Sequence, residues 1–132
     1  MTTFRYPAVM ACPRPRHMRN GHTYMPRKYA AYKHGVASAY RDAGGGLIAG
    51  PVRVSIDVMR ALPKSAPKSV GAEEDMHKPD VDNVAKGVMD ALNGVAYEDD
   101  RQVVSLSVLK MPRMRREHDE IRVRVESFDD KE

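Results

Sequence analysis

The 132-residue sequence has a single cysteine and no hydrophobic run of membrane-spanning length. One cysteine cannot form an internal disulfide, so the chain is not a disulfide-stabilised secreted domain, and a reducing cytoplasm is the expected location. The N-terminus also lacks the apolar core of a signal peptide. No internal repeat is present. With 42% hydrophobic residues, the chain is long enough for one domain with a modest core.

Acidic residues are absent from the first 41 positions, the earliest being Asp42. Eight basic residues give this N-terminal segment a formal charge of +8, whereas the remainder, with fourteen basic and eighteen acidic residues, carries −4. A basic segment followed by acidic clusters is typical of an enzyme that binds a polyanion and holds metal against it. The candidate DNA contacts in this segment are Arg14, Arg16, Arg19, Arg27 and Lys28. Arg14 and Arg16 alternate with prolines, which keep the backbone extended.

Hydrophobic periodicity predicts the order strand, helix, strand, helix, strand, strand. The expected elements are an edge strand within 4–11, a helix over 26–42, a strand over 51–59, a helix from 80 to about 94, and strands over 103–110 and 121–126. We expect the last two strands to form a hairpin. The predicted fold is an α/β domain, a small mixed β-sheet packed by two helices. Prolines, serines and lysines over 60–78 predict a long mobile loop, and 129–132 a polar tail.

The tyrosines of the first helix share one helical face. Tyr29, Tyr32 and Tyr40 recur with Val36 at helical spacing, while the basic residues lie elsewhere. Aromatic side chains among basic residues can stack on single-stranded bases. At this spacing they more often form core, and core is the prediction here.

The most informative stretch runs from Lys78 to Gly94, with Asp99 and Asp100 a short loop later. Apolar residues recur at helical spacing from Val81 to Leu92, and Asp80 is a good N-cap after a proline. Two carboxylates, those of Asp80 and Asp82, therefore lie at a helix N-terminus. We expect the helix and the following turn to bring the two acidic clusters together as a divalent-metal site built from oxygens.

Two familiar acidic motifs do not fit this stretch. A calcium-binding EF-hand loop starting at Asp80 needs glycine at its sixth position and glutamate at its twelfth, where the sequence has Ala85 and Ala91. An aspartyl-nucleophile phosphatase carries Asp-x-Asp after a buried apolar strand, whereas the polar residues 73–79 precede this one. Both interpretations are excluded.

The ordered set Pro-Asp-x-Asp-Asn-x-x-Lys, Asp-Ala-Leu-Asn-Gly and Asp-Asp before a β-like run, within 78–104, resembles the RusA family of Holliday-junction resolvases. The N-terminal Pro-Arg-Pro-Arg segment is also similar to that family. By this resemblance, the metal-binding aspartates are Asp80, Asp82 and Asp100, and the catalytic lysine is Lys86. Asn83 would orient a carboxylate, and Asp99 would assist or cap; which of Asp99 and Asp100 is the main ligand stays open. The implied cofactor is Mg²⁺.

The resemblance implies a Mg²⁺-dependent endonuclease that resolves four-way DNA junctions by paired symmetric nicks in recombination and repair. A homodimer is expected, because a junction has two-fold symmetry and needs two nicks. Its candidate surfaces are the Tyr29–Tyr40 face and the apolar side of 103–110. Two alternatives are a non-catalytic junction-binding protein of the same fold and a hydrolase of small phosphorylated substrates. Lys86 could also be an ordinary helix ion-pair partner of Asp82 or Asp90, and Asp90 suits a structural role.

Overall fold

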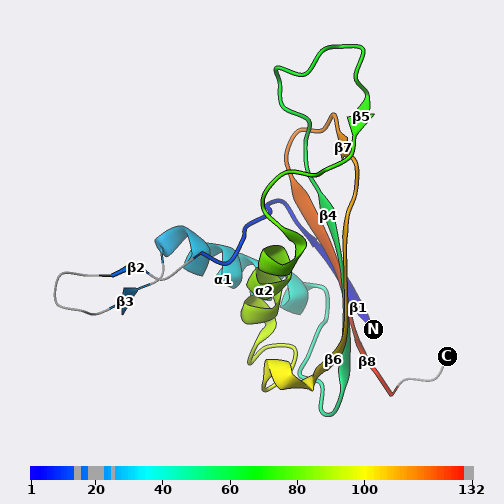
Figure 1. Cartoon of the computed structure of the whole chain (residues 1–132). Coiled ribbons are helices and arrows are strands. Elements are labelled where there is room, and N and C mark those ends of the chain that lie inside the picture. Colours follow the sequence, from blue (N-terminus) through cyan, green and yellow to red (C-terminus); the bar gives the residue numbers. More distant parts are fainter. Residues whose placement is uncertain (14–15, 18–22, 25, 130–132) are drawn as a thin grey trace.

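The computed structural model describes residues 1–13, 16–17, 23–24 and 26–129. The predicted order of the main elements is confirmed, with short strands added between them (Figure 1). The elements are β1 (Thr2–Tyr6), β2 (Arg16–His17), β3 (Thr23–Tyr24), α1 (Arg27–Asp42), β4 (Val52–Met59), β5 (Ala72–Glu73), α2 (Val81–Leu92), the 3-10 helix η1 (Asp100–Gln102), β6 (Val103–Lys110), β7 (Arg113–Met114) and β8 (Glu120–Ser127). Of the predicted polar tail, 130–132 lie outside the described residues.

A four-stranded mixed sheet forms one layer of the domain, in the order β1-β8-β4-β6. β1 is the predicted edge strand; it ends at Tyr6, because Pro7 has no N–H to donate to a ladder. β4 pairs in parallel with β6 and antiparallel with β8. The predicted hairpin of the last two strands is therefore wrong. β4 takes the position between them because its inward side chains, from Val52 to Val58, are almost wholly buried by both neighbours and the helices.

Both helices cover the same face of the sheet (Figure 1). The core prediction for the tyrosines is confirmed, since Tyr29, Tyr32 and Tyr40 are at most 3% exposed. The same burial makes the Tyr29–Tyr40 face wrong as a dimer surface, because this chain's own elements already cover it. No described helix is long and apolar enough to cross a membrane.

Beyond the sheet, 60–78 and 111–120 project together as an arm (Figure 1). β5 pairs with β7 inside this arm, and Arg115 donates to the carbonyls of Ala66, Pro67 and Val70. The loop predicted over 60–78 is thus fastened to a second loop, and its mobility stays a prediction. It leads directly into α2, so its contacts bear on the acidic residues at the start of that helix.

Candidate active site

The first acidic group lies at the N-terminus of α2. Buried apolar side chains between Val84 and Leu92 hold this helix against the sheet, and Asp80 is its N-cap. The N-cap carbonyl of Asp80 accepts from the Val84 N–H at 3.1 Å, but its carboxylate makes no capping hydrogen bond. Asp80, Asp82 and Asn83 are all exposed. Neither carboxylate takes part in an ion pair within the described chain, so their oxygens are open to a cation.

Lys86 lies one turn further along α2. Its Nζ is 3.8 Å from Asp90 Oδ1, and its side chain is 62% exposed. This is the ordinary helix ion pair weighed as an alternative, and at such exposure it is worth about 0.3–0.5 kcal/mol. A pair this weak does not prevent the ammonium from turning toward a bound phosphate.

Asp90 connects α2 to the rest of the helical layer. Its Oδ2 accepts a 2.7 Å hydrogen bond from the Tyr29 hydroxyl and lies 3.8 Å from Cys12 Sγ. Burial raises the pKa of Tyr29, and its hydrogen-bonded neighbours Cys12 and Asp90 raise it further. The hydroxyl therefore stays a donor, and this geometry agrees with a structural role for Asp90.

The second acidic group lies in the turn before β6. Asp99 Oδ1 accepts from the Arg101 N–H at 2.9 Å and so caps η1, and this hydrogen bond lowers the pKa of Asp99. Asp100 is the first residue of η1 and is exposed. Because Asp99 is engaged as the cap, Asp100 is the better candidate for a metal ligand at this turn.

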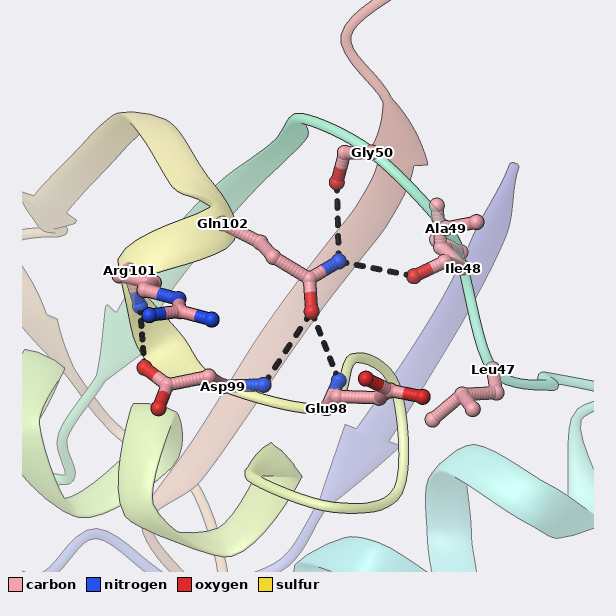
Figure 2. Close-up of a pocket in the computed structure, with 8 residues that line it drawn as sticks. All are labelled: Leu47, Ile48, Ala49, Gly50, Glu98, Asp99, Arg101 and Gln102. Atoms are coloured by element: carbon pink, nitrogen blue, oxygen red, sulfur yellow. Dashed lines mark hydrogen bonds between the residues drawn. The ribbon is translucent and has the colours of Figure 1, made fainter.

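Gln102 holds this acidic turn in place and lines a hollow of about 510 Å³ (Figure 2). Its side-chain oxygen accepts from the N–H groups of Glu98 and Asp99, at 2.8 and 3.2 Å. Its side-chain nitrogen donates to the carbonyls of Ile48 and Gly50, both at 2.9 Å. Sequence reasoning missed this residue, although Asp-x-x-Gln is a capping-box pattern that could have indicated it.

The two acidic groups lie on either side of α2 along the chain, Asp80 and Asp82 at its start and Asp99 and Asp100 after its end. The segment before Asp80 contacts Arg60 and Lys110, which lie at the ends of β4 and β6. The Asp99–Gln102 turn contacts 48–50, which precede β4. The eight residues of β4 span about 26 Å and the twelve of α2 about 18 Å. The two acidic groups thus lie on different elements, and the prediction that a helix and a turn bring them together as one metal site stays a prediction.

Mg²⁺ prefers oxygen ligands, keeps several waters and often takes only one or two protein carboxylates. Asp80 and Asp82 fit this requirement by chemistry, since both are exposed carboxylates at a helix N-terminus. Among the residues that the structure describes, however, no three His, Cys, Asp or Glu side chains are grouped to hold a metal ion. The candidate ligands of one chain are thus divided between the start of α2 and the turn that follows its end.

The candidate DNA contacts are only partly described. Arg27 and Lys28 are exposed in the first turn of α1. Arg14 and Arg19 lie outside the described residues, and of Arg16 only the backbone is described, in β2. The structure thus gives exposed positions to two of the five basic residues.

Comparison with known proteins gives two matches. A family model described as endodeoxyribonuclease RusA matches residues 7–126. Over 120 residues the chain is 41% identical to an uncharacterized protein, YqaN, of Bacillus subtilis strain 168, and the match covers 83% of this chain and 84% of that protein. The family match contains both acidic groups, β4, β6 and β8 up to its last residue but one.

Proposed function

The chain belongs to the RusA family of endodeoxyribonucleases, and we propose that it resolves four-way DNA junctions by paired symmetric nicks, with Mg²⁺, in recombination and repair. The observation that carries this proposal is the pair of exposed carboxylates, Asp80 and Asp82, at the start of α2 within the matched range, neither of which forms an ion pair in the described part of the chain. A protein that only binds DNA gains nothing from acids that face phosphate.

Each residue has a defined task in the proposed reaction. Asp80 and Asp82 hold the metal, and the helix N-terminus partly offsets their mutual repulsion. When bound, Mg²⁺ lowers the pKa of its water and polarises the phosphate. Asn83 orients a carboxylate through its amide. Lys86 stabilises charge on the phosphate or orients the attacking water, after exchanging its weak contact with Asp90 for the substrate.

A second copy of the chain completes the proposed site. Within one chain, Asp80 and Asp82 lie at the start of α2, whereas Asp100 lies after its end, in η1. In a two-fold dimer, the α2 start of one protomer can face the acidic turn of the other, and the same contact is made twice. Each of the two sites then combines Asp80 and Asp82 with Asp100 of the partner subunit, as a junction that needs two nicks requires.

The outer edge of β6 is the proposed dimer surface that the fold leaves accessible. β6 is the last strand of the four-stranded sheet. Its apolar side chains Val104, Leu106 and Leu109 are 57%, 43% and 57% exposed. An unpaired apolar edge strand is prone to pair with another chain, which here would be a second copy.

DNA is proposed to contact the basic N-terminal segment, through Arg14, Arg16, Arg19, Arg27 and Lys28. Each phosphate contact should release counterions, so binding should weaken as salt is added. The exposed positions of Arg27 and Lys28 support this assignment.

Incubation with a labelled synthetic four-way junction, with and without Mg²⁺, tests the function. A linear duplex of the same sequence is the substrate control. We expect symmetric nicks in the junction only when Mg²⁺ is present. Asp80→Asn should bind the junction and leave it intact, whereas Glu74→Gln, at an exposed acid outside the site, should cut normally. Junction binding by the wild type without nicks in either Mg²⁺ or Mn²⁺ would instead indicate a non-catalytic binding protein.

A further inference from the structure

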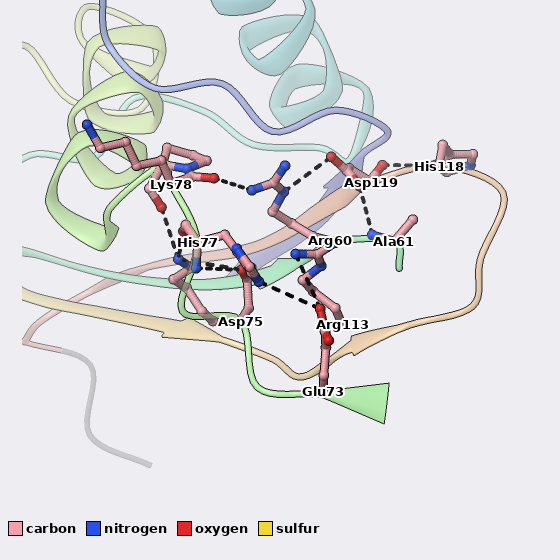
Figure 3. A network of polar contacts seen from close by, with 11 residues as sticks. Arg60, Ala61, Glu73, Asp75, His77, Lys78, Arg113, His118 and Asp119 are labelled. Atoms are coloured by element: carbon pink, nitrogen blue, oxygen red, sulfur yellow. Dashed lines mark hydrogen bonds and ion pairs between the residues drawn. The ribbon is translucent and has the colours of Figure 1, made fainter. Parts of the chain in front are cut away.

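Three consecutive peptide carbonyls precede Asp80, and each accepts a hydrogen bond from a cationic side chain. Lys110 Nζ donates to the carbonyl of His77 and, at 3.1 Å, to that of Pro79. Arg60 Nη1 donates to the carbonyl of Lys78 between them (Figure 3). Hydrogen bonds from charged donors are about twice as strong as neutral ones. Each of the three residues before Asp80 is therefore fixed by a hydrogen bond from a charged side chain.

The two cations come from neighbouring strands of the sheet. Arg60 directly follows β4, and Lys110 is the last residue of β6, where it pairs with Val58 in the parallel ladder. Parallel strands end at the same edge of a sheet, so both side chains reach the segment that passes over this edge. Arg60 is itself held by Asp119, whose carboxylate lies 3.5 Å from Arg60 Nε and also accepts from the Ala61 N–H (Figure 3).

Asp75 fixes the ammonium of Lys110. The Asp75 carboxylate is fully buried and lies 3.7 Å from Lys110 Nζ, and the lysine side chain is only 12% exposed. A buried carboxylate is costly unless a cation pairs with it. Asp75 Oδ1 accepts a 3.4 Å hydrogen bond from the His77 N–H, and Oδ2 has no hydrogen-bond partner in the described chain. Lys110 is therefore the cation that compensates this charge.

We propose that Lys110 and Arg60 are positioning residues that set Asp80 at the head of α2, with Asp75 as the counter-ion of Lys110. The Pro79 carbonyl belongs to the planar peptide that ends at the Asp80 nitrogen, so a hydrogen bond to that oxygen fixes the plane from which Asp80 projects. The Asp80 carboxylate makes no capping hydrogen bond to its own helix, and its direction depends on this backbone. The inference rests on the proposed function only in taking Asp80 as a metal ligand.

Three variants separate positioning from simple stabilisation. Asp75→Asn keeps both Lys110 donors on the carbonyls, so Mn²⁺ affinity should stay close to wild type. Lys110→Met removes the donors but also leaves Asp75 as an unpaired buried charge, which can prevent folding. The double variant Asp75→Asn/Lys110→Met removes that charge, so the fold recovers while the carbonyls of His77 and Pro79 still lack their donor.

Two readouts need neither DNA nor turnover. Calorimetric titration with Mn²⁺ should give about tenfold weaker binding in the double variant, the range found when groups that support metal ligands are removed. In metal-free protein, NMR should find faster hydrogen exchange at the Val84 amide, which donates to the Asp80 carbonyl, and unchanged exchange at Val88. Lys68→Met, at an exposed lysine of the arm, should change neither value.

A double variant with wild-type Mn²⁺ affinity and wild-type exchange at Val84 would overturn the proposal. Failure of the proposed function gives a different result. In that case Asp80→Asn would bind Mn²⁺ as the wild type does, while the exchange difference at Val84 would still report whether Lys110 holds the helix start.

Discussion

At one end of α2, Asp80 follows three carbonyls held by the charged side chains of Lys110 and Arg60; at the other, Asp100 follows a turn held by the neutral amide of Gln102. The first arrangement uses strong, long-reaching charges from the ends of two strands. The second uses four hydrogen bonds whose directions are fixed by one planar amide. The two ends should therefore respond to different changes, the first to loss of charge and the second to loss of shape.

The difference also bears on which side chains remain for chemistry. Paired carboxylates, such as the buried Asp75 and the half-buried Asp90, serve the scaffold. The exposed carboxylates of Asp80, Asp82 and Asp100 take part in no ion pair among the residues that the structure describes. Side chains on a backbone that is already fixed lose less conformational entropy when they bind a ligand.

The largest effect should come from removing one acid at either end. Asp80→Asn and Asp100→Asn should each abolish cleavage and leave junction binding intact, because each carboxylate is proposed to hold metal and not DNA. A mixture of the two variants distinguishes their arrangement. If each site combines Asp80 of one protomer with Asp100 of the partner subunit, a mixed dimer has one intact site, and random assortment should restore about a quarter of wild-type sites.

Nicking of a labelled junction after co-refolding of the two variants is the measurement. Asp80→Asn mixed with Asp82→Asn is the matched control, since both changes fall at the same end and no intact site forms. Recovery in neither mixture, with dimers confirmed by sedimentation, would place both acidic groups of a working site in one chain and so contradict the shared site.

Lys86 lies between the two ends, and its replacement should come next in size. Lys86→Ala should slow single-turnover cleavage by an amount equivalent to a few kcal/mol of transition-state stabilisation, on the order of that for a lost charge donor. The thermal midpoint should hardly move, because the exposed pair with Asp90 is worth about 0.3–0.5 kcal/mol. Lys64→Ala, at an exposed lysine of the arm, is the control. If Lys86→Ala cleaved junctions as fast as the wild type, Lys86 would have no catalytic role, and its only role would be the ion pair with Asp90.

Gln102 tests the end that is held by shape. Gln102→Leu keeps the approximate size of the side chain but leaves the N–H groups of Glu98 and Asp99 and two carbonyls to water. The expected loss is about 0.5–1.5 kcal/mol of unfolding free energy, measured by urea denaturation, because water can replace most of these hydrogen bonds. Gln102→Glu restores the acceptor but loses both donors, so it should rescue only part of this loss. If Gln102→Leu were as stable as the wild type, the hydrogen bonds that join residues 48–50 to the acidic turn would contribute nothing to stability.

The sequence was most informative where one residue type repeats with a clear period. Helical spacing predicted α1, α2 and the burial of Tyr29, and strict alternation predicted β4. Strand order was not predictable in this way, because alternation says which face is buried and not which strand is the neighbour. The hairpin prediction failed for this reason, as β4 separates the last two strands.

For the site, the spacing of the motif indicated which acidic residues to consider, but it did not predict how far apart they lie in the folded chain. Nothing in the separation of Asp80 and Asp100 along the chain says that β6 runs parallel to β4, so that α2 connects the end of one strand with the start of the other. The supporting residues were harder still. Lys110 closes an alternating strand and Asp75 stands in a polar run, so only tertiary structure reveals the contact between them. Gln102 was the exception, since a capping box is a local pattern.

The smallest effect should appear at the Asp99 cap, as a change in the pH dependence of stability. Asparagine caps a helix about as well as aspartate, so Asp99→Asn keeps an oxygen for the Arg101 N–H and removes the charge. The hydrogen bond lowers the folded-state pKa of Asp99, so the charged form is favoured by folding. Its contribution is complete above the ordinary aspartate pKa, about 3.9, and is lost as the pH falls through the lowered value.

Wild type should therefore exceed Asp99→Asn slightly in thermal midpoint near neutral pH, and the difference should close in the acid range below about pH 4. The effect should be small because the carboxylate is fully exposed and water screens it. Asp42→Asn, at an exposed acid away from η1, is the matched control and should give no such convergence. A constant offset between wild type and Asp99→Asn at every pH would show that the cap acts through shape alone. The charge of Asp99 would then not stabilise the turn beside Asp100, whereas charged side chains hold the segment before Asp80.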